Sequence, residues 1–387
     1  MPLLFCFERK KTTIVDELKM IRKLLYLTFI EIADLPTSGS SVRPQKMKEA
    51  FESFNIELKA FGGINNRIAV RKKTVRDVKL LLKSWKPDAC YIEPPSGPLF
   101  YYGDIKLIRQ IHRMGIPMSV FYRDAYWKYP EYGAEHKLSI IERIKQLIIK
   151  WMQIYQWGVF KKNIDLIYFP SITMAKEFTC PHKDALPPGG FVADAQEKKE
   201  LSNPLQFIFV GGASRNYGTF LTIDSFRKLN ESAIKAKVTY ICPENQWNSL
   251  NIDKDKYQTW LEVVHTAGDQ NLKPFYEQAD VALLVAPRTF YRDFAVPIKL
   301  FEYMSYLKPI VVTNCTETAR VVEENGIGWV TNDNVDSIVE KLEDLCNHPE
   351  MILKVREQVK KARDNNLWSS RAKKVIYDLN RFVNYKA

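Results

Sequence analysis

The sequence has few of the residues that hold metals or form disulfides. Its six cysteines are scattered without a C-x-x-C pair, and its five histidines show no zinc-like spacing. No D-x-D motif stands at an expected strand end. We therefore expect a reduced protein that contains no metal and uses no cofactor.

Long hydrophobic runs are also missing. No segment reaches the roughly 18 uncharged apolar residues that a membrane span needs, and the start "MPLLFCFERKK" is too short for the core of a signal peptide. We expect a cytoplasmic protein that is not exported. The first convincing strand comes only at 24–32, so residues 1–20 are expected to form an N-terminal extension, upstream of a natural start at Met20.

Acidic residues are outnumbered by basic ones. The 57 lysines and arginines against 45 acidic residues give a formal net charge of +12, which should attract anions such as nucleotides, lipid headgroups or nucleic acid. Charge alone does not choose among them. A hydrophobic content of 46% with 26% charged residues is typical of a folded globular protein, and 387 residues suit two domains.

Short apolar strands alternate with amphipathic helices along the chain. The first half offers strands at 24–32, 56–61, 88–95 and 117–125. Such alternation favours a parallel sheet covered by helices on both faces. The same rhythm restarts at "LQFIFVGG" (205–212). The sequence therefore predicts an α/β fold with two Rossmann-like domains.

The domain boundaries follow from composition. We expect an N-terminal Rossmann-like domain over 21–190 and a second Rossmann-like domain over 205–365. The polar run at 191–204 reads as the linker between them. The strongly helical segment 366–387 is expected to form a C-terminal helix that packs back on the N-terminal domain.

The glycine pattern of dinucleotide-binding domains is not present. The turn after the first strand reads "ADLPTSGSSVRP", and the turn after the first strand of the second half reads "VGGASRNYG". Neither matches G-x-G-x-x-G, so a nicotinamide-dependent dehydrogenase is disfavoured.

The stretch "PIKLFEY" carries chemistry that suits a nucleotide. Pro297 can start a helix whose first turn points backbone N–H groups at an anion. Lys299 and Glu302 lie three residues apart and share a helix face, so a phosphate can meet the lysine and a pair of hydroxyls can meet the glutamate. A plain surface ion pair between the two is the alternative.

An ordered set of three segments resembles the C-terminal, nucleotide-sugar-binding domain of GT-B glycosyltransferases. The segments are 265–287, 297–313 and 324–330. The two-domain plan covers nearly the whole chain from Leu24. The resemblance implies two domains that face a central cleft, with Glu302 on the ribose and Pro297, Lys299 and Leu300 near the diphosphate. It also implies donor contacts from Gly211, Gly212, Arg215, His265 and Gly268.

The sequence departs from the commonest retaining members of that family in two places. Phe294 stands eight residues before Glu302, where many of them have a second glutamate, and the loop with Arg215 lacks the lysine expected after it. It looks closer to bacterial capsule and exopolysaccharide transferases, such as the xanthan glucuronosyltransferase group. Retention and inversion of the sugar's configuration both stay open.

In the N-terminal half, an apolar strand ends in Arg123 and Asp124, and an aromatic run follows. Ligands bind at the carboxyl ends of strands in open α/β sheets, aromatic rings stack on sugars, and a carboxylate there can take a proton. We predict Asp124 as the general base and Arg123, Tyr126 and Trp127 as acceptor contacts. The alternative is an Arg/Asp pair that holds the loop, with the aromatic residues filling the core.

Three further candidates lie in the same half. Ser40 and Arg43 stand in a small-residue loop that enters a helix, which suits an acceptor contact but equally suits an ordinary turn. Glu93 follows another strand and is the second candidate for the base. The basic amphipathic helix around 138–162 and the basic segment 65–76 suit an anionic membrane, although packing of the helix on the N-terminal domain is the alternative.

The leading hypothesis is a metal-independent hexosyltransferase, peripheral on the inner face of the cell membrane. It would move a sugar from a nucleotide-sugar donor to a glycan or a polyprenyl-linked acceptor. A nucleotide-sugar epimerase could use the same two-domain plan. A nucleic-acid-binding protein would explain the charge of +12, but no known nucleic-acid module accompanies it, so we expect no nucleic-acid partner.

Overall fold

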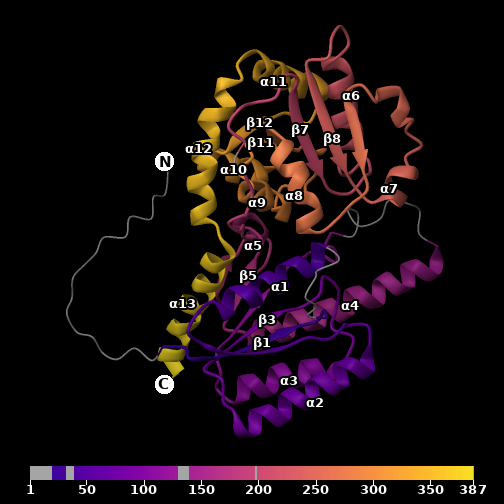
Figure 1. Ribbon diagram of the computed structural model, residues 1–387. Coiled ribbons are helices and arrows are strands. Elements are labelled where there is room, and N and C mark those ends of the chain that lie inside the picture. Colours follow the sequence, from indigo (N-terminus) through magenta and orange to yellow (C-terminus); the bar gives the residue numbers. More distant parts are fainter. Residues whose placement is uncertain (1–19, 32–38, 130–138, 197, 387) are drawn as a thin grey trace.

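The computed structural model describes residues 20–31, 39–129, 139–196 and 198–386. The described chain forms two α/β domains, each built on a six-stranded parallel sheet (Figure 1). The predicted fold class is therefore confirmed. Residues 1–19 of the expected N-terminal extension and the end of the aromatic run after Asp124 lie outside the described residues.

The N-terminal sheet has the strand order β2-β1-β3-β4-β5-β6. Its strands are β1 (Lys23–Thr28), β2 (Glu57–Phe61), β3 (Ala89–Glu93), β4 (Met118–Phe121), β5 (Leu166–Phe169) and β6 (Lys183–Ala185). The helices are α1 (Gly39–Glu52), α2 (Ile68–Ser84), α3 (Tyr102–Arg113), α4 (Ile140–Asn163) and α5 (Ile172–Lys176). The order reverses between β1 and β3, which marks the switch point of this domain.

The C-terminal sheet has the order β12-β11-β10-β7-β8-β9 and reverses between β7 and β10. Its strands are β7 (Leu205–Val210), β8 (Ala236–Ile241), β9 (Leu261–Val264), β10 (Val281–Leu284), β11 (Ile310–Thr313) and β12 (Gly328–Thr331). The helices are α6 (Thr219–Leu229), α7 (Glu244–Asn248), the 3-10 helix η2 (Lys254–Tyr257), α8 (Asp269–Gln278), α9 (Ile298–Ser305), α10 (Thr316–Asn325), α11 (Val335–Asn347), α12 (Glu350–Asn365) and α13 (Trp368–Lys386).

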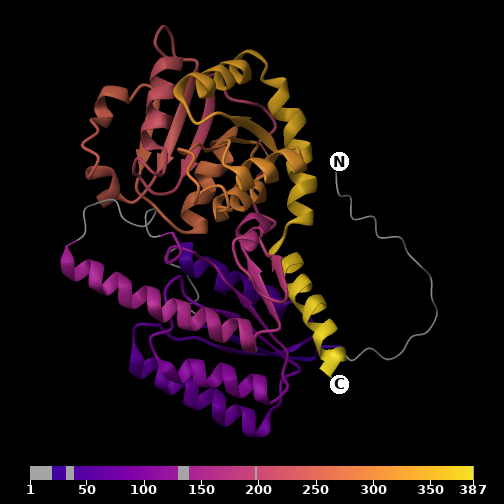
Figure 2. The same cartoon turned by 180° about the vertical axis from the view of Figure 1, so that it is seen from behind.

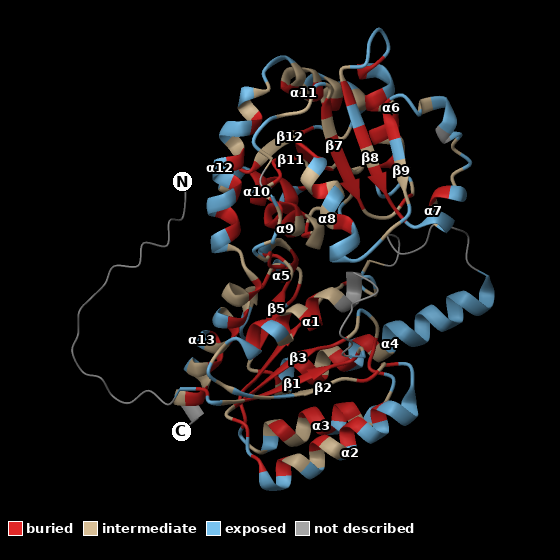
Figure 3. Ribbon diagram, in the orientation of Figure 1, coloured by how far each residue is buried: buried red, intermediate tan, exposed pale blue. Residues whose placement is uncertain are grey.

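Several inner strands are nearly continuous apolar runs because helices cover both sheet faces. Every residue of β3, β4, β5 and β11 is buried. In a parallel sheet with two covered faces, no position alternates toward water. The burial view shows the two red cores, one per domain (Figure 3).

The last helix, α13, leaves the C-terminal domain and lies against the N-terminal one (Figures 1 and 2). Trp368, Ala372, Val375 and Leu379 recur at helical spacing and are buried in a core cluster that contains Phe51 of α1. The chain therefore crosses between the domains a second time, after the first crossing that precedes β7.

The loop between β10 and α9 also joins the domains. Phe294 in this loop is 2% exposed and packs into the core cluster of the N-terminal domain. Its backbone oxygen accepts a hydrogen bond from Ser171 Oγ at 2.6 Å, and Thr173 N donates to Glu317 Oε1 of α10 at 3.1 Å. A phenylalanine at this position therefore forms part of the interdomain contact.

None of the helices within the described residues combines the length and the apolar composition that crossing a bilayer requires.

Candidate functional site

Helix α9 places Lys299 and Glu302 at the carboxyl edge of the C-terminal sheet. Lys299 Nζ lies 2.7 Å from Glu302 Oε1, which also accepts a hydrogen bond of 2.9 Å from Tyr276 OH. Burial, reinforced by the charge of Glu302, raises the pKa of Tyr276, so its hydroxyl stays a donor. The ion pair considered as an alternative from the sequence is thus present. A lysine ammonium has three donors, so this contact leaves others for a phosphate.

The amino end of α9 has no side-chain cap. Pro297 precedes the helix with φ −66 and offers no side-chain acceptor to the first-turn N–H groups, although its backbone oxygen accepts from Leu300 N at 3.2 Å. Uncapped N–H groups and the helix dipole give this end a partial positive charge, which suits an anion. Leu300 itself is fully buried, so any contact that it makes is through its backbone.

His265 and Gly268 follow β9 at the same sheet edge. His265 Nδ1 lies 3.0 Å from the backbone oxygen of Cys242, which orients the ring. Gly268 begins α8 with φ +91, a conformation that residues with a side chain rarely adopt, and its α-carbon faces open space. Both positions leave backbone groups accessible to a ligand.

The loop after β7 carries Gly211, Gly212 and Arg215. A side chain on Gly212 would lie 2.6 Å from the ring of Tyr217, and one on Gly218 would lie 1.9 Å from the backbone oxygen of Val285. Gly212 therefore lets the loop pack closely against the ring of Tyr217, and Gly218 lets it pack closely against the backbone just after β10. Gly211 N donates to the backbone oxygen of Ile241 at 3.0 Å.

Arg215 faces a cavity of about 1700 Å³ between the domains. Its guanidinium lies 4.5 Å from the ring of Phe220, which supports it without satisfying its N–H donors. The C-terminal wall contains residues 213–217, Phe220, Ser249, Leu250, Thr289, Tyr291, Arg292 and Ala295, and the N-terminal wall contains Ser96, Gly97, Tyr126, Trp127 and six residues of α4. Two predicted acceptor residues and one predicted donor residue thus line one space.

Asp124 lies behind Tyr291, which lines this cavity. Tyr291 OH donates to Asp124 Oδ1 at 3.0 Å and accepts from Ala125 N at 3.3 Å. The rings of Tyr291 and Tyr126 stack with centroids 4.3 Å apart. Burial and the nearby Asp124 charge raise the pKa of Tyr291, so its hydroxyl remains protonated. Asp124 is half-buried, in a contact that spans the two domains.

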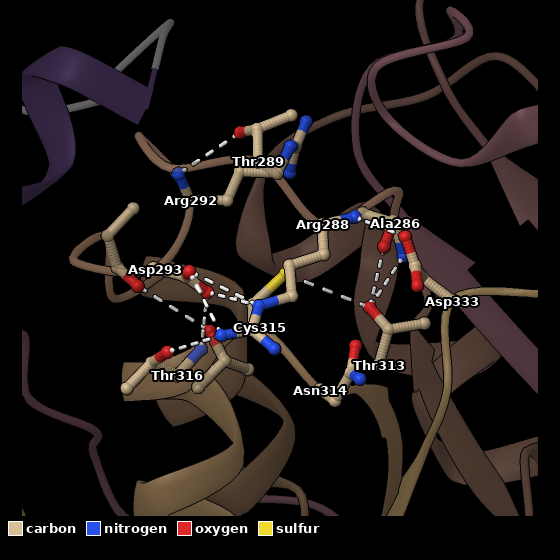
Figure 4. Close-up of polar contacts among 12 residues, drawn as sticks. Ala286, Arg288, Thr289, Arg292, Asp293, Thr313, Asn314, Cys315, Thr316 and Asp333 are labelled. Atoms are coloured by element: carbon tan, nitrogen blue, oxygen red, sulfur yellow. Dashed lines mark hydrogen bonds and ion pairs between the residues drawn. The ribbon is translucent and has the colours of Figure 1, made fainter.

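A hydrogen-bond network holds the loop between β10 and α9, which carries Tyr291, in place (Figure 4). Asp293 Oδ1 accepts hydrogen bonds of 2.9 Å from both Arg288 Nε and Thr316 N. Burial alone would raise the pKa of Asp293, but these bonds outweigh it and lower the pKa. Thr313 Oγ1 donates to the backbone oxygen of Ala286 at 2.7 Å. The loop between β10 and α9 is therefore anchored at both ends.

Glu93 and Arg43 lie inside the N-terminal domain. They are 1% and 3% exposed, and Arg43 Nε lies 3.2 Å from Glu93 Oε1. Tyr91 OH donates to the same oxygen at 2.7 Å, and Arg123 Nη2 lies 3.6 Å from Oε2. The guanidinium of Arg43 stacks on Phe121 at 3.4 Å. These contacts make the cluster a structural element of the sheet edge and put neither Glu93 nor Arg43 on the cavity wall.

The predicted residues thus divide into three groups. Arg215, Tyr126 and Trp127 line the interdomain cavity, with Asp124 behind Tyr291. Pro297, Lys299, Leu300, Glu302, His265 and Gly268 lie along the edge formed by α8, α9 and β9. Arg43, Glu93 and Arg123 form the buried cluster. Ser40 lies in the first turn of α1, where its side chain is not among those described.

Sequence reasoning missed Tyr291 and Tyr276. Tyr291 lies seven residues beyond the end of β10, so the strand-end rule that identified Asp124 does not reach it directly. Tyr276 falls on the buried face of α8, where an aromatic residue normally indicates core packing. In both cases the partner carboxylate is distant in the sequence, at 167 and 26 residues.

Comparison with known proteins agrees with this geometry. Residues 192–363 match the family model of the glycosyl transferases group 1. This region spans β7 to α12 and contains all the predicted donor residues. No match was found among the curated proteins.

Solved structures share the architecture of most of the chain. A sucrose-phosphate synthase from Thermosynechococcus elongatus aligns with a TM-score of 0.65 at 10% identity, covering 93% of this chain and 98% of that one. WaaG, a glycosyltransferase involved in lipopolysaccharide biosynthesis, gives 0.62 at 13% identity, covering 92% and 99%. HepE from Anabaena, in complex with UDP, gives 0.58 at 9% identity, covering 93% and 100%. The chain therefore has the GT-B fold, and the predicted resemblance is confirmed at that level.

Proposed function

We propose that the protein is a glycosyltransferase of the hexosyltransferase type. It transfers a sugar from a nucleoside-diphosphate sugar to a hydroxyl of a lipid-linked or growing glycan in bacterial polysaccharide biosynthesis. The observation that carries the proposal is the cavity between the domains, with Arg215 on one wall and Tyr126 and Trp127 on the other. A space between the carboxyl ends of two parallel sheets suits a reaction in which each domain holds one ligand.

The donor is assigned to the C-terminal domain. The carboxylate of Glu302 accepts hydrogen bonds from the two ribose hydroxyls, while Tyr276 keeps it oriented. The diphosphate lies at the amino end of α9, near Lys299, and extends toward Arg215. Backbone groups at His265 and Gly268 hold the base. The match to group 1 glycosyltransferases and the structural likeness to HepE, solved with UDP, support this assignment.

The acceptor is assigned to the N-terminal wall of the cavity. Tyr126 and Trp127 supply ring faces for a sugar. Asp124 accepts the proton of the attacking hydroxyl as its oxygen bonds to the anomeric carbon of the donor sugar. The bond from that carbon to the diphosphate breaks, and the nucleoside diphosphate leaves with the electron pair.

Charge on the leaving diphosphate is offset by fixed positive groups. These groups are Lys299, Arg215 and the positive end of the α9 dipole. They are already in position before the reaction, so they stabilise the developing charge without rearrangement. The proposed reaction therefore needs no metal ion and no cofactor besides the donor. Activity that survives removal of divalent ions by a chelator is the expected result.

We further propose that the protein works at the inner face of the cell membrane as a peripheral cytoplasmic enzyme. A polyprenyl-linked acceptor resides in that membrane, and the net charge of +12 favours an anionic surface.

A panel of nucleotide sugars, each incubated with and without a bacterial membrane lipid extract, tests the proposal. We expect one donor to release its nucleoside diphosphate faster when lipid is present, with its sugar found on a lipid-soluble product. Conversion of a donor into another nucleotide sugar without any acceptor would instead make the protein an epimerase. Release of no nucleoside diphosphate from any donor would contradict glycosyl transfer.

A further inference from the structure

Helix α4 projects from the N-terminal domain (Figures 1 and 3), and six of its residues line the cavity. Residues 139–151 are exposed without a break, although this stretch contains many large apolar side chains. Ile140, Ile141 and Trp151 are 77%, 67% and 69% exposed. Only the second half of the helix is anchored, through buried residues such as Gln156.

The exposed apolar residues of α4 lie on one face. At about 100° per residue, eight of them fall within about 140° of the helix circumference without a charged residue among them. They are Ile140, Ile141, Ile144, Leu147, Ile148, Trp151, Ile154 and Tyr155. We call this set the apolar face of α4. Large contiguous apolar patches on a monomer mark an interaction site.

The opposite face of α4 lines the interdomain cavity. Arg143, Gln146, Ile149, Lys150 and Gln153 contribute to the cavity wall and lie on the side of the helix away from the centre of the apolar face, and Leu147 is the one member of that face that also lines the cavity. Gln153 also donates to the backbone oxygen of Ser96 at 3.0 Å, which holds this side against the domain. Apart from Leu147, near its border, the apolar face therefore points away from the cavity.

Basic residues border the apolar face on both sides. Arg143 and Lys150 follow one border and Lys145 follows the other, whereas Glu142 lies on the polar side. Glu142 is engaged at the helix start, where its Oε2 accepts from Ser139 N at 2.8 Å and Ser139 Oγ accepts from Glu142 N at 3.3 Å. This capping box defines the start of α4.

We propose that α4 lies in the surface of an anionic lipid bilayer, with its apolar face among the acyl chains and its polar face toward the interdomain cavity. An apolar face with cations at both borders is the pattern of helices that lie in the membrane plane, because the cations reach the headgroups on either side. The biological reason for this contact rests on the proposed function, since a lipid-linked acceptor then enters the cavity along α4. The contact itself needs neither donor nor acceptor.

Co-sedimentation of the full chain with lipid vesicles, without any nucleotide sugar, tests the contact. We expect strong binding to phosphatidylcholine mixed with phosphatidylglycerol, weak binding to phosphatidylcholine alone, and a decrease with added salt. The double variant Ile144→Asn/Trp151→Asn should weaken binding on the order of 100-fold, because two large side chains no longer enter the apolar region. Both residues are exposed, so the fold should be retained, which circular dichroism checks.

Leu353→Asn is the matched control. Leu353 is 41% exposed on α12 of the other domain, so its replacement should leave vesicle binding unchanged. Brominated lipids should quench the fluorescence of the wild-type chain, and Trp151→Phe should remove that quenching. Equal binding by the double variant and the wild type would overturn the proposal. A wild-type dimer that ignores vesicles and is lost in the double variant would overturn it too, because a second copy would then cover the face.

Vesicle binding and sugar transfer are measured separately, so the membrane contact and the proposed function can fail independently. A chain that binds vesicles through α4 but transfers no sugar would leave this proposal intact and refute only the proposed function. A chain that transfers sugar to a water-soluble acceptor but does not bind vesicles would refute the membrane contact of α4 and leave glycosyl transfer intact.

Discussion

The two sheets end differently at their carboxyl edges. In the N-terminal domain, the edge beside the switch point is filled by the ion pair of Arg43 and Glu93, both buried. In the C-terminal domain, the corresponding edge ends in the glycine loop after β7 and the partly exposed pair of Lys299 and Glu302. At the C-terminal edge Lys299 and Glu302 are partly exposed, which suits the proposed anionic ligand. The N-terminal edge is filled by its own ion pair, so the proposed base is Asp124, after β4.

The largest effect should come from Asp124→Asn. If Asp124 takes the acceptor's proton, turnover should fall roughly 10² to 10⁴-fold while donor affinity is kept, because the donor lies on the other domain. Initial rates and donor affinity, measured on the same preparation, check this. Tyr291→Phe is the matched control, since it keeps the stacked ring and removes only the hydroxyl that donates to Asp124. It should reduce turnover far less. Normal turnover in Asp124→Asn would remove the residue from the reaction.

Glu93→Gln should act on stability rather than on the reaction. Removing one partner of a buried ion pair leaves the charge of Arg43 uncompensated, which costs about 3 to 5 kcal/mol. Urea unfolding should show this loss in the free energy of unfolding, with turnover per folded molecule nearly unchanged. A variant with wild-type stability and no turnover would instead make Glu93 the base and erase the difference between the two sheet edges.

Glu302→Ala should weaken nucleotide binding about 10- to 100-fold, because hydrogen bonds to a charged group contribute roughly 1.5 to 3 kcal/mol. Titration calorimetry with nucleoside diphosphates measures the change. Lys299→Ala sharpens the test, since a lysine that meets phosphate should matter more for a nucleoside diphosphate than for the bare nucleoside. Equal losses for the two ligands would argue that Lys299 only pairs with Glu302.

The smallest effect concerns Lys308, which is buried before β11 and donates to the backbone oxygen of Ala279 at 2.8 Å. Burial, with the nearby charges of Arg356 and Lys198, lowers its pKa from 10.5 to about 7. Between these values the unfolded chain binds more protons, so stability should rise with pH, by at most about 1.4 kcal/mol per unit. Below about pH 7 the cost of the buried charge is fully present.

Lys308→Met should flatten that slope. Unfolding free energies compared from about pH 7 to about pH 9, below the range in which tyrosines ionise, measure it. The prediction concerns the C-terminal domain alone, so a probe in that domain should report the change and a probe in the N-terminal domain should not. An unchanged slope would mean that Lys308 is charged in the folded protein.

Much of the fold could be predicted because buried parallel strands leave a strong local signal. Segments such as 205–210 and 310–313 are apolar at all but one position and are bounded by turn residues or helix starts. The helix at Lys299 and Glu302 was also predictable, since Pro297 marks its start. The spacing of three residues then places both side chains on one turn.

Other features have no local signal. Arg43 is a charged residue near a small-residue loop, and nothing nearby tells it from an exposed arginine. Its partners Glu93 and the backbone oxygen of Leu186 lie 50 and 143 residues away. Likewise, the basic segment 65–76 forms the first turns of α2, and Arg71 within it is buried in an ion pair with Asp104. The helical pattern of α4 was visible in the sequence, but its projection depends on the tertiary arrangement.

The most direct measurement is a crystal structure of the protein with a nucleoside diphosphate bound. The account predicts the ribose against Glu302 and the diphosphate at the amino end of α9, with Arg215 turned toward the diphosphate. A nucleotide bound at the N-terminal sheet edge, against Arg43 and Glu93, would contradict the account.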